Sequence, residues 1–151
     1  MAFASLSLKG RALRLLSQRE HSRAELERKL APHEQVPGEL ARVLDELAER
    51  GFISEARVVQ SVLHQRAPRF GAARVRQELQ ARGIAADAVA EAVTRLQGSE
   101  LERARAVWRR RFAAPPADAR ERARQARFLM ARGFAGAIVA RVLRGATEGG
   151  E

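Results

Sequence analysis

The chain has 151 residues, no cysteine and a formal net charge of +10, which excludes a disulfide framework and a thiolate metal site. No apolar run reaches the roughly 20 residues that a membrane-spanning helix needs, and Met1 to Leu8 is too short and too weakly apolar for a secretory signal, so we expect a cytoplasmic protein. Arginine supplies 26 of the 28 basic residues, and the net charge rises from +1 over residues 5–51 through +3 over 52–97 to +8 over 98–145, a gradient that predicts attraction to polyanions.

The first predicted helix follows a flexible N-terminus of residues 1–6 and spans Ser7 to Gln18. After a break, Ser22-Arg-Ala-Glu25 has the pattern of a capping box, in which the serine hydroxyl and the glutamate each accept a hydrogen bond from the other's backbone N–H. The box predicts the start of a second helix.

A proline-containing loop from Pro32 to Val36 separates the second helix from a strongly amphipathic third one. Pro37 suits the first position of this helix, and Gly51 ends it. Ser54 is then an N-cap that opens a fourth helix running to about Arg66.

A basic helix lies at the centre of the chain. We expect Gly71 to cap its start and Phe70, just before the cap, to pack on Val75 as a hydrophobic staple. Arg82-Gly83 ends the helix with a cation in the last turn and a residue that accepts positive φ. Another helix follows from about Asp87 to Leu96.

The C-terminal third opens with Ser99-Glu-Leu-Glu102, which also has the capping-box pattern. The helix that follows directs Trp108 and Phe112 toward the core, and Pro115-Pro116 ends it. Asp118 caps the next helix.

The helix that begins at Asp118 ends at Arg132-Gly133-Phe134, and a last helix carries an apolar stripe of Ile138, Val142 and Leu143. We expect the polar segment from Gly145 to Glu151 to be a disordered tail.

Internal repetition connects these elements. A shift of 49 residues places the leucine stripe of the first third on the apolar stripe of the second, and a shift of 50 places Arg74, Leu79, Arg82 and Gly83 on Arg124, Leu129, Arg132 and Gly133. The sequence therefore predicts an all-α protein of three tandem three-helix repeats, at residues 7–51, 52–97 and 98–144. Because one repeat is near the lower limit for an adequate core, the repeats should stack into an elongated, curved array.

Four segments in this order resemble the RecX regulatory proteins over roughly Leu6 to Leu143. They are Arg19-Glu-His-Ser-Arg-Ala-Glu-Leu26, Leu47-Ala-Glu-Arg-Gly-Phe-Ile-Ser-Glu-Ala-Arg57, Arg69-Phe-Gly-Ala-Ala-Arg-Val-Arg-Gln-Glu-Leu79 with Arg82-Gly83, and Arg127-Phe-Leu-Met-Ala-Arg-Gly-Phe134. The chain departs from the family pattern at Pro32 to Pro37, where relatives often have an Arg-Gly-hydrophobe turn.

The resemblance implies tandem three-helix repeats that bind the RecA recombinase as a filament on single-stranded DNA. It implies a protein that lodges in the helical groove of the filament and inhibits ATP hydrolysis, strand exchange and coprotease activity. It thus points to a regulator of homologous recombination, DNA repair and the SOS response, with weak nonspecific binding to single- and double-stranded DNA. We expect a monomer.

The candidate partner-binding residues are mainly arginines, whose planar fork suits carboxylate and phosphate alike. Each has a structural alternative: Arg132 as a C-terminal cap, Phe70 as a staple, and the other arginines as a solvated flank. Trp108 and Phe112 beside the arginine run suggest base stacking, but their helical spacing favours the core. The candidates are Arg69, Phe70, Arg74, Arg76, Arg109, Arg110, Arg111, Arg124, Arg127 and Arg132.

Nothing in the sequence predicts an enzyme, a cofactor or a metal. Phosphate-binding glycine loops and nucleophile elbows are absent, and the three histidines share no metal-ligand spacing, so we interpret them as surface or capping residues. The alternative function is an autonomous basic helical protein that binds DNA or RNA, because three-helix units also resemble helix-turn-helix modules.

Overall fold

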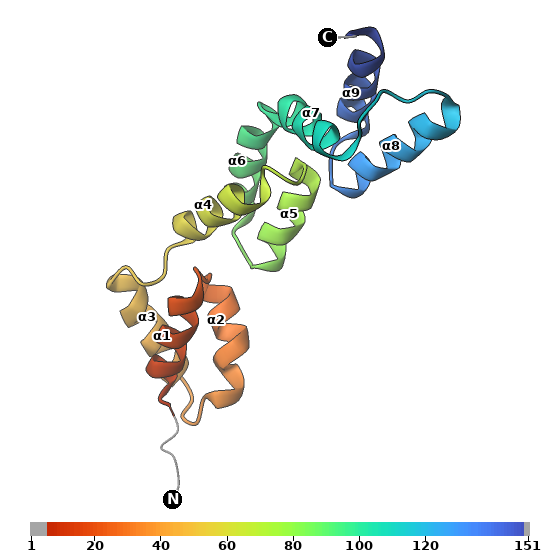
Figure 1. Ribbon diagram of the computed structural model, residues 1–151. Helices are drawn as coiled ribbons and strands as arrows, with labels where there is room; N and C mark the ends of the chain where they lie inside the picture. Colours follow the sequence, from red (N-terminus) through yellow and green to blue (C-terminus); the bar gives the residue numbers. More distant parts are fainter. Residues whose placement is uncertain (1–5, 150–151) are drawn as a thin grey trace, which may run out of the picture.

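The computed structural model describes residues 6–149, which form nine α-helices, one 3-10 helix and no strand. The helices are grouped in threes along one elongated molecule (Figure 1). Unit 1 contains α1 (Leu8–Gln18), α2 (Arg23–Leu30), η1 (Ala31–His33) and α3 (Glu39–Glu49). Unit 2 contains α4 (Glu55–Arg66), α5 (Ala72–Ala81) and α6 (Ala86–Gln97), and unit 3 contains α7 (Glu100–Arg111), α8 (Ala119–Ala131) and α9 (Gly136–Gly149). This arrangement confirms the all-α, three-repeat prediction.

Each unit has its own hydrophobic core. In unit 1 the core is built from leucines of all three helices, in unit 2 mainly from valines, and in unit 3 from mixed aliphatic side chains and Phe134. Equivalent positions are buried in successive units, such as Leu30, Leu79 and Leu129. Because the three cores are separate, residues outside them have to make the contacts between units.

Most of the predicted caps are present. The Ser22 hydroxyl accepts from the Glu25 N–H at 3.1 Å, and the Glu25 carboxylate accepts from the Ser22 N–H at 3.1 Å, which completes the capping box of α2. Ser54 and Asp118 accept in the same way from Arg57 and Glu121. These local hydrogen bonds fix where the helices begin.

Neighbouring units meet at their middle helices. The C-terminal end of the middle helix in one unit lies on the first turn of the middle helix in the preceding unit. The Arg82-Gly83 end of α5 lies on the first turn of α2, where the Ser22 hydroxyl donates to the Arg82 carbonyl. The Arg132-Gly133 end of α8 lies on the first turn of α5, where the Gly71 N–H donates to the Arg132 carbonyl at 2.8 Å. We call these the first joint and the second joint.

Two predicted helix starts are wrong. The N-cap of α3 is Gly38 in a left-handed conformation, so Pro37 lies in the turn before the helix, and the Glu34 carboxylate accepts from the Leu40 N–H at 2.8 Å. Ser99 makes no capping hydrogen bond because only Gly98 and Ser99 separate α6 from α7. Its backbone (φ −117°, ψ 7°) is not extended, and its hydroxyl instead contacts the Leu96 carbonyl and Arg103.

The tail prediction is wrong for residues 145–149, because α9 continues to Gly149. This helix packs against α7 and α8. The Thr147 hydroxyl donates to the Leu143 carbonyl at 3.0 Å, which ties the polar segment to the preceding turn of the same helix. Residues 150–151, and residues 1–5 of the predicted flexible N-terminus, lie outside the described part of the chain.

His21 is also misplaced by the sequence interpretation. Its side chain is only 1% exposed, whereas His33 and His64 are exposed as expected. His21 lies just before the capping box of α2, where it contacts the Arg19 carbonyl and Lys29.

Candidate partner-binding surface

A row of arginine and phenylalanine side chains crosses from unit 2 into unit 3. Arg74 lies over the Phe70 ring, with its guanidinium carbon 4.6 Å from the ring centroid, and Arg132 lies over the same ring at 5.5 Å. Arg132 is also 5.0 Å from the Phe128 ring. Two units therefore contribute to one continuous surface, which we call the Arg-Phe row.

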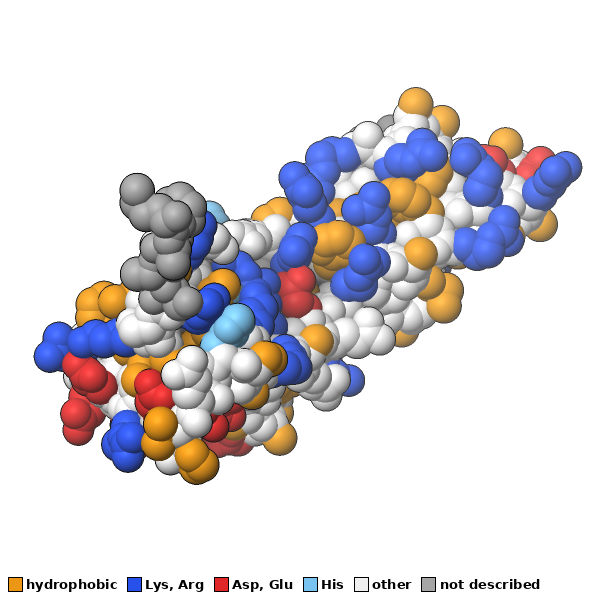
Figure 2. All heavy atoms as spheres, turned by 90° about the horizontal axis from the view of Figure 1, so that it is seen from below, with side chains coloured by type: hydrophobic (Ala, Val, Ile, Leu, Met, Phe, Trp, Pro, Cys, Tyr) orange, Lys and Arg blue, Asp and Glu red, His pale blue; other side chains and the backbone are white. Residues whose placement is uncertain are grey.

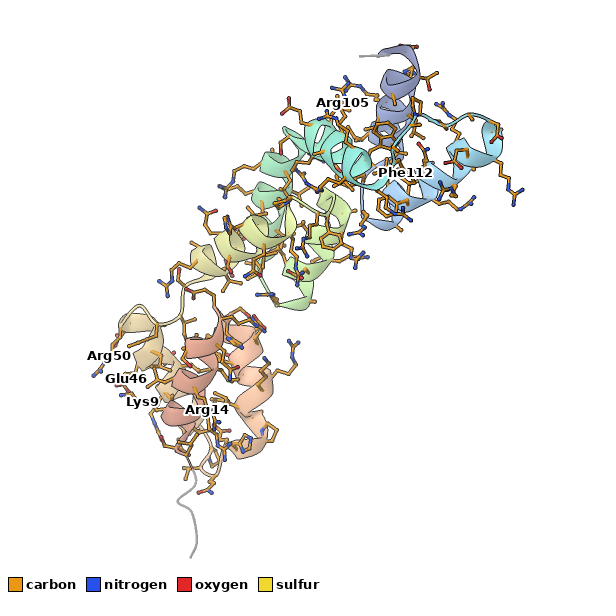
Figure 3. All side chains as sticks on the ribbon, viewed as in Figure 1. Lys9, Arg14, Glu46, Arg50, Arg105 and Phe112 are labelled. Carbon is orange, nitrogen blue, oxygen red and sulfur yellow. The ribbon has the colours of Figure 1, made fainter. Side chains whose placement is uncertain are left out.

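The row continues along unit 3. Arg111 lies 5.5 Å from the centroid of Phe128 and 5.4 Å from that of Phe112, and Arg124 lies 5.4 Å from Phe112. The two rings meet edge to face at 5.4 Å. Figure 3 shows Phe112 at the C-terminal end of α7, beside α8. Each cation over a ring face is attracted by the π quadrupole, so the rings hold the guanidiniums in place.

The rings support the row and are not its outer surface. Phe112 is buried and Phe70 and Phe128 are half-buried, whereas Arg74, Arg111 and Arg124 are exposed. A partner would therefore meet guanidinium groups first. This favours the structural interpretation of Phe70 and Phe112, while their arginines remain free to act.

Two of the hollows along the row are lined at least partly by unit 2. One of about 310 Å³ lies between α4 and α5 and is lined by Arg66, Phe70 and Arg74, together with Val75, Gln77 and Glu78. The other, of about 330 Å³, spans the second joint and is lined by Arg69, Val107, Arg110, Arg111, Phe128 and Arg132. The second hollow has no acidic lining residue, so it is the more cationic of the two.

A half-buried arginine clamp fixes the row across the second joint. The Arg103 guanidinium of α7 donates to the carbonyls of Ala67 (2.9 Å), Phe70 (2.7 Å) and Leu96 (3.0 Å). Burial lowers the pKa of Arg103, and the nearby Glu100 carboxylate opposes that shift. Glu100 is itself buried and accepts from the Ala72 N–H at 3.3 Å. The backbone that carries Phe70 is thus tied to unit 3.

The arginines of the row differ in how free they are. Arg124 donates to the Glu121 carboxylate at 2.6 and 3.1 Å, a hydrogen bond that raises the pKa of Arg124. Arg110 donates to the Pro68 carbonyl at 2.7 Å. Arg69 is exposed, lines the second hollow and has no carboxylate within 4.0 Å among the residues described. Arg69 is therefore the most available cation beside the row.

The structure brings seven of the ten predicted residues together. Phe70, Arg74, Arg111, Arg124 and Arg132 form the row, and Arg69 and Arg110 line its second hollow. Arg76, Arg109 and Arg127 are exposed, and within the described residues none of them lines either hollow or faces one of the three rings. They serve below as matched controls.

The sequence interpretation missed Phe128 as a site residue. Arg124, Phe128 and Arg132 are spaced four apart, which places them on one helix face, so this signal was available. No comparable spacing in the sequence points to Arg66 and Arg103, because their partners come from other helices. Figure 2 shows Lys and Arg side chains with hydrophobic ones between them along the half of this face away from the N-terminus.

The described residues offer no support for a metal site or a membrane span. They contain no cluster of three or more side chains suited to hold a metal ion. None of the helices between residues 6 and 149 combines the length and apolar character that crossing a bilayer requires. The surface is equipped for anion binding through hydrogen bonds and charge.

Comparison with known proteins identifies all three units. Family models described as the first, second and third three-helix domains of RecX match residues 9–47, 54–93 and 99–143. The chain is 63% identical over 139 residues to the regulatory protein RecX of Leptothrix cholodnii, covering 92% of this chain and 88% of that one. It is 53% identical over 141 residues to the regulatory protein RecX of Ralstonia nicotianae, covering 93% and 89%.

Solved structures share the fold. A crystal structure of RecX from Lactobacillus salivarius superposes with a TM-score of 0.75 at 17% identity, covering 93% of this chain and 94% of the other. A second crystal structure, of a regulatory protein RecX, gives a TM-score of 0.71 at 19% identity and covers 89% and 70%. At this identity the likeness establishes the three-unit architecture.

Proposed function

This chain belongs to the RecX family of regulatory proteins, and from that premise we propose that it binds the RecA recombinase filament on single-stranded DNA and inhibits it. The proposed position is the helical groove of the filament, and the proposed effects are loss of ATP hydrolysis, strand exchange and coprotease activity. The protein acts as a monomer in the cytoplasm and needs no catalytic group. The family is a regulatory one and is not a family of enzymes.

The observation that carries the proposal is the Arg-Phe row with its acid-free hollow. A groove that contains a DNA strand and protein edges offers phosphates and carboxylates together, and a guanidinium binds either one in a planar, bidentate geometry. The row extends over two units that are clamped to each other by Arg103. A preorganised surface loses less conformational entropy on binding.

Inhibition requires only a difference in affinity. If the protein binds one conformation of the filament, or its ends, more tightly than the alternatives, the equilibrium shifts by that difference. A net charge of +10 speeds the encounter with a negatively charged filament through electrostatic steering.

The test is RecA's DNA-dependent ATP hydrolysis on preformed filaments, titrated with this protein at moderate salt in the presence of competitor DNA. We expect inhibition that the competitor does not relieve. An effect that follows the amount of free DNA would instead support the second candidate, an autonomous DNA- or RNA-binding protein, which the arginine-rich surface also favours.

A matched pair of variants tests the surface. Arg69→Glu with Arg111→Glu reverses two cations at the second hollow, and Arg76→Glu with Arg127→Glu reverses two exposed cations away from it. We expect the first pair to raise the half-inhibitory concentration by about tenfold or more, which corresponds to about 1.4 kcal/mol. The second pair should change it much less. Equal effects would show that only overall charge matters.

A further inference from the structure

Another hollow lies in unit 1, outside the Arg-Phe row. Its volume is about 330 Å³, at the small end of the range for ligand pockets of roughly 300–1,000 Å³. Three basic side chains, Arg11, Arg14 and Lys29, line it together with His33 and Gln18. Its other lining residues are Leu6, Leu15 and Leu30. The hollow therefore combines a cationic rim with apolar walls.

The helices present these groups by simple spacing. Arg11, Arg14 and Gln18 are three and four residues apart on α1, so they share one face of that helix. Lys29 lies in the last turn of α2, and His33 ends the 3-10 helix that follows it. The hollow is thus formed where the C-terminal end of α2 passes α1.

The cations of this hollow lack acidic partners, although unit 1 as a whole is nearly neutral. No carboxylate of the described residues lies within 4.0 Å of Arg11, Arg14 or Lys29, and none lines the hollow. On the other side of the unit, Lys9 pairs with Glu46 at 2.8 Å and Arg50 pairs with the same carboxylate at 3.4 Å. Figure 3 shows Lys9, Glu46 and Arg50 grouped along α1 and α3, with Arg14 apart from them.

The buried histidine orients one of these cations. Lys29 Nζ lies 3.2 Å from His21 Nε2, and His21 Nδ1 lies 3.0 Å from the Arg19 carbonyl. An ammonium group only donates and a carbonyl only accepts, so the imidazole is neutral with its proton on Nδ1. Lys29 is therefore held by a neutral acceptor and keeps its full charge for an anion.

We propose that this hollow binds a phosphate of a nucleic-acid strand, as a contact separate from the Arg-Phe row. Two arginines and a lysine supply donors for the phosphate oxygens, and the leucine walls suit the apolar faces of the adjoining sugar or base. A carboxylate-rich peptide satisfies the rim but leaves the leucines without a partner. The inference rests on the proposed function only in that the chain works on a DNA strand.

The position of the hollow allows one strand to contact the protein at two distant places. Unit 1 lies at one end of the molecule and unit 3 at the other (Figure 1). Two weak contacts far apart on one strand act together, because the second contact forms at the effective concentration set by the first. A strand that reaches both is held more tightly than a strand that reaches one.

The test uses single-stranded thymidine oligonucleotides of increasing length and no recombinase, with binding followed by fluorescence anisotropy at several salt concentrations. The variant is Arg11→Gln with Arg14→Gln, and the control is Arg42→Gln with Arg50→Gln, which removes two charges elsewhere in the same unit. For long oligonucleotides we expect the variant to bind about fivefold to tenfold less tightly. The slope of log K against log salt should fall by about 0.7 to 1.4, which is one or two phosphate contacts.

Short oligonucleotides should bind the variant and the control alike, because one contact then suffices. If the variant and the control also match for long oligonucleotides, the proposal is wrong. It is equally wrong if the variant loses affinity for a polyglutamate peptide and keeps its affinity for DNA, since the hollow would then be a peptide site. Because no recombinase is present, these outcomes are independent of filament inhibition. Circular dichroism confirms that each variant is folded.

Discussion

The two joints have the same arrangement of helices but differ in the groups that form their hydrogen bonds. In the first joint, side chains make the recorded contacts: the Ser22 hydroxyl donates to the Arg82 carbonyl, and Arg28 reaches the Ala81 carbonyl at 3.4 Å. In the second joint, the Arg74 guanidinium reaches the Ala131 carbonyl in the same way at 3.1 Å, and the backbone also pairs directly, through Gly71 N–H to the Arg132 carbonyl and Ala73 N–H to the Gly133 carbonyl at 3.3 Å.

The second joint has further support. Only two residues separate α6 from α7, and the half-buried side chain of Arg103 and the buried side chain of Glu100 cross between the units. We infer that units 2 and 3 move as one body that carries the Arg-Phe row, and that unit 1 is the first to separate. Side-chain contacts can be exchanged for water more cheaply than paired backbone groups.

The largest effect should come from Gly71→Ala. A Cβ at this position would lie 2.2 Å from the Gly133 carbonyl oxygen and 2.4 Å from its carbon, and backbone on both sides leaves no room for adjustment. We expect a loss of about 3 kcal/mol or more and a fall in Tm of about 10 °C, measured by calorimetry. Gly136→Ala is the control, because nothing lies within 4 Å of its Cβ position. A Tm fall of only a few degrees would contradict the close backbone approach.

Arg103→Met should have the next largest effect. The substitution keeps much of the aliphatic stem but removes the donors to three carbonyls, and we expect a loss of about 2–3 kcal/mol. Urea unfolding measures it, with Arg95→Met on the exposed side of α6 as the control. If the two variants unfold alike, the clamp does not stabilise the second joint.

The equivalent glycines Gly83 and Gly133 test the comparison directly. Both have positive φ, +73° and +92°, and a Cβ at Gly83 would lie 2.4 Å from the Ala24 Cβ, whereas one at Gly133 would lie 2.7 Å from the Arg74 nitrogen. Gly83→Ala should cost about 1–2 kcal/mol, and Ala24→Gly should recover part of this because it removes the clashing atom.

No side-chain truncation should recover Gly133→Ala to the same degree, because part of its clash is with backbone. Thermal unfolding of the single and double variants measures the difference. Equal recovery in both joints would mean that the second joint adjusts as easily as the first.

The smallest effect should be a weakening of the first joint in acid. Burial lowers the pKa of His21 from its usual 6.5, mainly by disfavouring the imidazolium. A group whose pKa is lowered on folding stabilises the protein above its unfolded pKa, so this contribution is complete above about pH 6.5 and is lost as the pH falls below that.

Glu25 extends the same trend to lower pH. Burial alone would raise the pKa of this carboxylate, but hydrogen bonds from Arg19 and the Ser22 N–H bring it below its usual 4.5. Hydrogen exchange measured from pH 7 to pH 4, after correction for the intrinsic rates, should show the α2 amides losing protection before those of Gly71 and Ala73. His21→Gln should remove the part of the change near pH 6. Uniform loss across both joints would contradict this order.

Local signals in the sequence predicted most of the helices, and contacts between distant residues explain the failures. The Ser22 box is correct because both of its partners lie within three residues and an extended backbone precedes them. The same pattern at Ser99 fails because the preceding helix ends two residues earlier. The pairing of Gly71 with Arg132 depends on how units stack, and no local pattern contains that information.

The site divides in the same way. Arginine content and the Arg-Phe-Gly segment drew attention to Arg69, Phe70 and Arg74, which the structure places beside the same row. The row itself could not be predicted, because Arg132 reaches Phe70 only after the second joint forms. The selection of Arg111 over Arg109 depends on which direction a side chain leaves α7. The sequence predicted the position of a residue along its helix, but it did not predict how the helices of two units align.

The two outer ends of the array differ from its joints. The helix α8 begins ten residues before Leu129, whereas α5 begins seven before Leu79, so the N-terminal end of α8 is about one turn longer than that of α5. At the other end, α2 passes into η1 with Pro32, and no Arg-Gly turn projects from it. A head-to-tail contact that could repeat would generate an open fibre of copies. Neither end of the array repeats the half-joint that the units use within the molecule.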